Sequence, residues 1–342
     1  MADKIKNPLN LLNLAGLAQL EPEAATEAAK QAAKAEVPGG TPYGNLEDLE
    51  GTWVGTGFNL IEVPNMNQIK PGPPPKDKFR VILNSTAETL VFSKITGGIV
   101  NKGNAQDDIT YYGMHYLQQV SDVNLPKGQD GIHLETGLFL NLVATDAPPE
   151  APSIARLGSI PHGDTILAQG QSFVLNGAPT IGPANSLPFT VENGKRVDDN
   201  QPNYLAILNN APVPPGIPGT AVLDPNIILQ NAIQGQNIIK TVVIALDANP
   251  MDGVGNVPPN APPSTQVGGI NNIPFIIVNA NPICLSAIFW IETVQNADGS
   301  TFLQLQYTQT VILDFPVFGP PPHNTLTDIK WPHISVATLR KQ

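Results

Sequence analysis

Histidines are the residues of this chain best suited to bind a metal or to carry a proton near neutral pH. His333 lies in the segment Trp331–Arg340, whose composition predicts a short final β-strand. Ile334, Val336 and Leu339 give this strand apolar neighbours. An imidazole fixed on such a strand is a candidate ligand for a metal ion or a haem iron. The alternative is a histidine that is simply packed or exposed at the surface.

A second histidine lies in the segment Gly131–Gly137, which also reads as a strand. His133 and Glu135 are two residues apart, and a strand places such residues on the same face. We expect them to serve as an acid–base pair, as a metal-binding pair or as a polar pair inside a barrel. Two ligands without a third do not define a protein metal site.

The other histidines have less distinctive surroundings. Ser159–Asp164 contains Pro-His-Gly-Asp, which predicts a turn that leaves His162 exposed or bonded to the backbone. A catalytic His162–Asp164 pair is the alternative. His115 and His323 complete the set of five, and His323 follows a run of prolines.

Composition excludes several classes of function. The net charge of -11 disfavours binding to nucleic acid and to anionic membrane surfaces. A single cysteine, Cys284, excludes an intrachain disulfide framework and a multi-cysteine zinc site. It fits a cytoplasmic location. No apolar run reaches the roughly 18–20 residues of a spanning helix, so we expect no membrane span.

The chain divides into a helical start and a long β region. Leucines at helical spacing predict a helix over residues 8–36, within an N-terminal segment 1–45. A single domain over 46–341 follows, interrupted at 171–282 by an insertion rich in proline, glycine and asparagine. The predicted strands are Thr52–Glu62, Phe79–Ser85, Glu88–Ile95, Tyr111–Val120, Gly131–Val143, Ser153–Ile160, Asp164–Phe173, Ile238–Leu246, Ile273–Asn279, Ile283–Thr293, Phe302–Phe315 and His333–Leu339.

Strands of this number, separated by turn residues, indicate an antiparallel barrel or sandwich. In Phe302–Phe315, apolar and polar residues alternate, which predicts one buried and one wet face. Trp53 lies among the glycines of Gly51–Gly57, where an indole suits the closed end of a barrel.

In order, these segments resemble the nitrobindin family of small haem-binding β-barrels, which are similar in shape to fatty-acid-binding proteins and lipocalins. The matching motifs are Gly51–Gly57, His133–Gly137, Leu167–Gln169 and His333–Lys341. The insertion 171–282 has no counterpart in the compact members of that family. The resemblance implies a mainly β fold: an antiparallel up-and-down barrel of the lipocalin/calycin type.

The resemblance also implies haem b as the cofactor and His333 as the axial ligand of its iron. His133 would lie on the opposite, open side and act in catalysis. The side chains expected to contact the cofactor are Ile132, His133, Gln169, Thr308 and Thr310. The implied activity is binding of nitric oxide with isomerisation of peroxynitrite, or a peroxidase-like reaction with peroxide.

Two other functions fit the same patterns. The barrel would instead carry fatty acids or other hydrophobic small molecules, with the histidines as polar groups of the pocket. In a third interpretation the protein is structural, and the leucine-rich helix and the insertion form the interface of a homo-oligomer.

Overall fold

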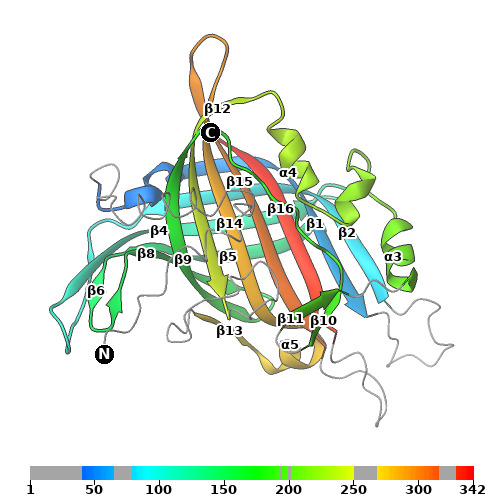
Figure 1. The fold of residues 1–342 in the computed structure, drawn as a ribbon, viewed down its shortest axis with the longest axis horizontal. Helices are drawn as coiled ribbons and strands as arrows, with labels where there is room; N and C mark the ends of the chain where they lie inside the picture. The colour runs from blue at the N-terminus through cyan, green and yellow to red at the C-terminus, as the bar shows by residue number, and fades with distance from the viewer. Residues whose placement is uncertain (1–40, 65–78, 193–194, 199–201, 250–267, 316–328) are drawn as a thin grey trace.

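A computed structural model describes residues 41–64, 79–192, 195–198, 202–249, 268–315 and 329–342. Within these ranges, ten long antiparallel strands close into a β-barrel (Figure 1). In their order around the barrel, the strands are β12 (Asn237–Ala248), β14 (Asn281–Gln295), β15 (Thr301–Asp314), β16 (Trp331–Lys341), β1 (Gly51–Pro64), β2 (Phe79–Lys94), β4 (Ile109–Asp122), β5 (Gly131–Leu142), β8 (Ser153–Ile160) and β9 (Asp164–Asn176). The ring closes because β9 also pairs with β12.

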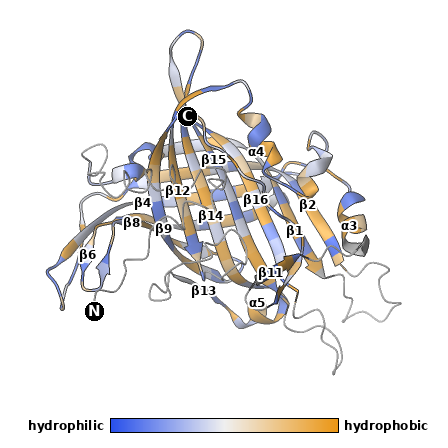
Figure 2. Cartoon of the chain, in the orientation of Figure 1, coloured by the Kyte–Doolittle hydropathy of each residue, from blue (hydrophilic) through white to orange (hydrophobic). Residues whose placement is uncertain are grey.

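The alternation of residues along β15 shows how the sequence sets the two faces of the wall. Leu305 and Tyr307 belong to the apolar core inside the barrel. The side chain of Gln306 points outward and donates to the backbone oxygen of Leu229. This confirms the period-2 pattern and the antiparallel barrel. The prediction of a wet face is wrong, because Gln306 and Thr308 on the outer face are buried under the segment that covers the wall. Hydrophobic stretches on β14 and β16 are visible in Figure 2.

One end of the barrel is closed by a short 3₁₀ helix, η1 (Gly44–Leu49), that precedes β1. Leu46 and Leu49 on this helix are fully buried together with Trp53, which faces the interior. The indole Nε1 of Trp53 donates to the carbonyl oxygen of Leu49 at 2.7 Å, so its polar atom is satisfied. Trp53 therefore occupies the closed end, as its sequence context predicted.

The predicted insertion is shorter than 171–282, because both of its ends belong to the barrel wall. β9 continues to Asn176, and residues 237–248 form β12, the strand that closes the ring. Between them lie β10 (Phe189–Glu192), β11 (Lys195–Asp198), α3 (Pro202–Asn209), η2 (Gly219–Val222) and α4 (Ile227–Ala232). This part covers the outer wall, where Phe58 and Val336 pack with Ala221 and Leu229. α3 contacts β2 and α4 contacts β16 (Figure 1).

The remaining elements are small. β3 (Ile99–Asn101) pairs with β4, β6 (Thr145–Asp146) pairs with β7 (Pro149–Glu150), and β13 (Gly269–Asn272) pairs with β9. The prediction of a strand over Ile273–Asn279 is wrong, because Pro274–Asn279 forms the helix α5. Pro274 stands at the first helical position, where its missing N–H costs nothing. The predicted strands Phe79–Ser85 and Glu88–Ile95 are one continuous strand.

The helix predicted over residues 8–36 lies outside the described residues. Among the helices that the structure describes, none combines the length and the apolar character needed to cross a bilayer.

Replacing Trp53 tests the closed end. Trp53→Ala removes a fully buried indole and leaves a cavity, so we expect the free energy of unfolding to fall by about 3–5 kcal/mol. Val54→Ala, at the neighbouring exposed position, is the control and should cost about 0.5 kcal/mol or less. Urea denaturation followed by circular dichroism measures both. Equal effects of the two substitutions would contradict the closure by Trp53.

Candidate functional site

Three histidines gather at the end of the barrel opposite Trp53. His333 lies near the start of β16, His133 near the start of β5, and His162 in the turn between β8 and β9. The ring centroids of His133 and His162 are 6.0 Å apart. Both rings are close enough to contribute to the lowered pKa of His333. The closed sheet therefore brings together residues that are up to 200 positions apart in the sequence.

His333 faces the barrel interior and is only partly buried. Its backbone pairs with Ile61 of β1 and Val311 of β15, and its Nε2 lies 2.8 Å from Oδ1 of Asn59. Burial lowers the pKa of His333 to about 3, and the neighbouring His133 and His162 lower it further. His333 is therefore neutral at pH 7, which is the form that can coordinate a metal.

His133 and Glu135 share the interior face of β5, as their spacing predicted. His133 Nε2 lies 3.4 Å from Oε2 of Glu135, a carboxylate with no exposed side-chain surface. The other oxygen, Oε1, accepts hydrogen bonds from Tyr116 and from two nitrogens of Arg156 at 2.8 and 3.2 Å. Burial opposes the charge of Glu135, but the Arg156 guanidinium and the hydrogen bonds from His133 and Tyr116 together outweigh it, and the pKa of Glu135 falls to about 2.

Arg156 is the buried cation at the centre of this group. Its side chain is only 2% exposed, and its guanidinium also donates to Oε1 of Gln309 at 2.7 Å. The rings of Tyr116, Phe139 and Phe289 surround it, with centroids 5.6–5.8 Å from Cζ. A charge in such surroundings is stable only because Glu135 neutralises it and because the rings present their negative faces.

A second interior carboxyl group, Glu88 of β2, has a different environment. It accepts hydrogen bonds from the Tyr307 hydroxyl at 2.6 Å and from Nε2 of Gln118 at 2.8 Å. Burial raises the pKa of Glu88 to about 6, although these two donors act in the opposite direction. Glu88 is therefore an interior group that gains or loses its proton in mildly acidic solution.

Three residues predicted to contact a cofactor lie on the outer face of the wall. Gln169 alternates with Ala168, which belongs to the interior core. Ile132, next to His133, falls at an irregularity in the pairing of β5 with β4 and is half-buried. Gln169 instead donates to the hydroxyl of Ser153 at 2.9 Å. Gln169 therefore does not line the interior, unlike the expectation for this position.

The same correction applies to Thr308 and Thr310 of β15, which alternate with the interior Tyr307. Thr308 donates to Asn226 in the segment that covers the outer wall. In a strand, a register that differs by one residue exchanges the two faces, and this accounts for Gln169, Thr308 and Thr310.

The other predicted groups lie in simpler surroundings. His162 is exposed in its turn, as expected. Asp164 begins β9, and burial raises its pKa while His162 and His133 act in the opposite direction. His115 is exposed on the outer face, 3.0 Å from the Thr136 hydroxyl, and His323 lies outside the described residues.

Sequence reasoning missed Arg156, Tyr116, Glu88 and Asn59. Arg156 pairs with Phe139 across β5 and β8, so its position inside the barrel follows from a strand pairing that is not visible in the sequence. Alternation from Trp53 along β1 would have placed Asn59 on the inner face with His333.

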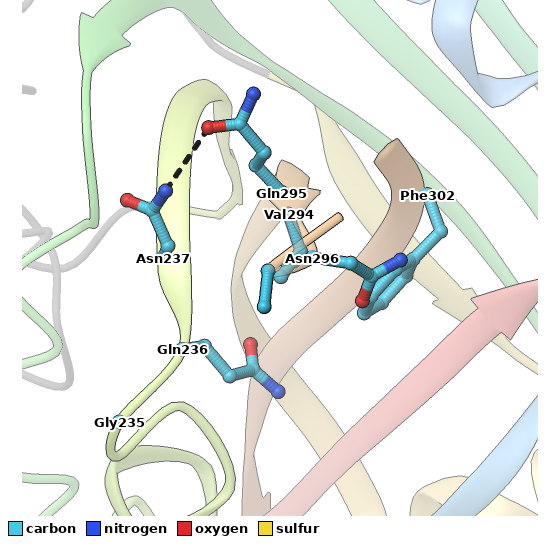
Figure 3. A pocket seen from close by; sticks show the side chains of 8 residues that line it. Gly235, Gln236, Asn237, Val294, Gln295, Asn296 and Phe302 are labelled. Atoms are coloured by element: carbon cyan, nitrogen blue, oxygen red, sulfur yellow. Dashed lines mark hydrogen bonds between the residues drawn. The ribbon is translucent and has the colours of Figure 1, made fainter. Parts of the chain in front are cut away.

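No cluster of three or more histidine, cysteine, aspartate or glutamate side chains suited to a metal ion occurs in the described part of the chain. A cleft of about 420 Å³ lies at the end of the barrel opposite the three histidines, beside the start of β12 and the loop between β14 and β15 (Figure 3). Amide side chains of Gln236, Asn237, Gln295 and Asn296 surround it beside Phe302. It contains none of the residues predicted to act in function.

No protein-family model matches this chain, and no curated protein sequence matches it. The fold and the interior polar groups thus define its class as a closed antiparallel β-barrel with ionisable groups inside.

The raised pKa of Glu88 predicts a pH dependence of stability. Unfolded Glu88 ionises near pH 4.5, whereas in the folded protein it stays protonated until about pH 6. Its contribution is therefore complete below pH 4.5 and is lost as the pH rises through 6, a loss of about 2 kcal/mol. Glu88→Gln should remove this part of the pH dependence.

Denaturation curves of both proteins between pH 4 and 7.5 measure it. Other buried carboxyl groups affect both proteins equally, so the difference between them isolates Glu88. Parallel stability curves would show that Glu88 ionises normally in the folded state.

Proposed function

We propose that this barrel binds haem b through His333 at its histidine-lined end. The observation that carries the proposal is the state of His333: an imidazole that faces the interior, is neutral at pH 7 and has its Nε2 engaged by Asn59. With Nε2 bonded to Asn59, the other ring nitrogen, Nδ1, would be the one to bind a haem iron, since a neutral imidazole can coordinate a metal through either nitrogen. The sequence resemblance to nitrobindins supports the same assignment.

The residues of this end fit such a group. The porphyrin supplies four nitrogens, so the protein needs to supply only one, and a cluster of three protein ligands is not required. Ile61 and Val311 are the cross-strand neighbours of His333, and their partly buried apolar side chains would favour contact with a flat hydrophobic ring. When bound, the iron would supply an open position for nitric oxide, peroxynitrite or peroxide.

His133, held by Glu135, would donate and accept protons beside this position. The Glu135 carboxylate stays ionised because Arg156 neutralises it, and its Oε2 lies 3.4 Å from His133 Nε2. An imidazole held by a carboxylate in this way can give or take a proton at its other nitrogen. His133 would therefore assist a reaction without coordinating the iron.

Reconstitution with haem tests the proposal. Wild-type protein titrated with haemin should give a Soret band that saturates at one haem per chain. His333→Ala should weaken binding at least tenfold or abolish the band, because the axial nitrogen is gone. His115→Ala, on the exposed outer face of β4, should bind like wild type. Absorbance spectra and difference titrations measure all three. A Soret band equal in wild type and His333→Ala would refute ligation by His333.

A second function, transport of an amphipathic hydrophobic molecule, is favoured by Arg156. Its guanidinium is enclosed by three aromatic rings inside the barrel, a polar anchor within apolar surroundings. This carrier function predicts a co-purified lipid, visible in native mass spectra, and lipid binding that His333→Ala leaves unchanged. Arg156→Leu would reduce that binding, whereas loss of lipid in His333→Ala would contradict the carrier function.

A further inference from the structure

Four neighbouring strands contribute to a row of hydrogen-bonded polar side chains that ends on His333. His333 of β16 contacts Oδ1 of Asn59 on β1 at 2.8 Å. Nδ2 of Asn59 donates to Oδ1 of Asn84 on β2 at 3.3 Å, and the two residues are direct partners in the sheet. Nδ2 of Asn84 donates to Oδ2 of Asp122 on β4 at 2.7 Å. Asn59 and Asp122 are buried.

This row has a direction, and Asp122 determines it. An ionised carboxylate only accepts hydrogen bonds, so Asn84 must turn its NH₂ group towards Asp122. The carbonyl oxygen of Asn84 then faces Asn59, and Asn59 must donate to it from its own NH₂ group. The oxygen of Asn59 is thereby left for His333, and it can only accept. The Nε2 of His333 must therefore carry the proton.

Two further contacts hold the row in place. The Ser335 hydroxyl, on the same strand as His333, also donates to Oδ1 of Asn59 at 2.8 Å. At the other end, Oδ1 of Asp122 accepts from the backbone N–H of Asn124 at 2.9 Å and from its side chain at 3.2 Å. Both ends of the row are therefore anchored, and neither amide is free to turn over.

We propose that Asp122 acts through Asn84 and Asn59 as a positioning residue that fixes the tautomer of His333, so that Nδ1 carries the lone pair available to a ligand. The tautomer itself follows from the hydrogen bonds alone. Its use in coordinating iron rests on the proposed function. A neutral imidazole in the other tautomer would present an N–H where the ligand needs an electron pair, and second-shell hydrogen bonds select the tautomer in metal sites generally.

The test is ¹⁵N NMR of the ring nitrogens of His333 in the full-length, haem-free protein at pH 7. Wild type should show a single tautomer, protonated at Nε2. Asp122→Asn replaces the pure acceptor by an amide that offers either a donor or an acceptor. With Oδ1 still accepting from Asn124, the new NH₂ group faces Asn84 and the row reverses, so the proton of His333 should shift from Nε2 towards Nδ1. This variant keeps the Oδ1 that accepts from Asn124.

A swapped pair provides the sharper test. In Asn84→Asp combined with Asp122→Asn, the pure acceptor moves to position 84, where it still faces the NH₂ group of Asn59. The direction at Asn59 is restored, so the single Nε2–H tautomer should return. Asn141→Leu, whose amide donates to Pro42 near the closed end, is the control and should leave His333 unchanged. A purely structural role of Asp122 would not be rescued in this way.

The outcomes are distinct. A wild-type His333 protonated at Nδ1, an unchanged tautomer in Asp122→Asn, or a swapped pair that fails to restore it would each overturn the inference. A haemin titration of the same samples separates this from the proposed function. If the NMR pattern is as expected but no Soret band appears, the control of the tautomer by Asp122 is supported and the proposed haem binding is refuted. If a Soret band appears but wild-type His333 shows a mixture of tautomers, haem binding is supported and the control of the tautomer by Asp122 is refuted.

Discussion

The pairing of β9 with β12 is the contact on which the rest of the structure depends. It joins Asn176 to Lys240 at one end and Gln169 to Asp247 at the other, and it removes the two free edges that an open sheet would have. Only a closed wall has an inside, and only then does alternation along each strand divide side chains into interior and exterior sets. The segment between β9 and β12 makes this closure by crossing the outer wall, where it buries Phe58, Leu60 and Val336.

The closed interior imposes a second constraint, since polar groups inside it have few water molecules to bond. The buried ion pair shows how this is done: Glu135 has Arg156, and Arg156 has Gln309 and three aromatic rings besides. Glu88 has no cation in contact, and the free-energy cost of burying it is lowered in another way. Burial raises its pKa and so favours the neutral acid. The row from Asp122 to His333 satisfies the same requirement, with each acceptor facing a donor.

Strand content, the antiparallel barrel, the closed end at Trp53 and the shared face of His133 and Glu135 could all be predicted from sequence, because each depends on local periodicity or spacing. Which face a residue occupies could be predicted only where a neighbour marked the interior. Thr308 and Gln169 were placed by family resemblance and lie outside, since a difference of one residue reverses the face. β12 looked like part of an insertion because its partner β9 precedes it by more than sixty residues. α5 has the composition of a strand, and only its proline and its surroundings make it helical.

His333 and His133 lie at the same end of one barrel, yet their partners give them different chemistry. His133 meets a carboxylate directly, at 3.4 Å, and this carboxylate keeps its charge because Arg156 holds it. His333 is separated from Asp122 by two neutral amides, which pass on the direction of the hydrogen bonds but not the charge. The first arrangement suits a group that exchanges protons, and the second suits a neutral ligand with one defined lone pair. The difference arises from which strand each histidine occupies, since β5 neighbours the strand of Arg156 whereas β16 neighbours the strand of Asn59.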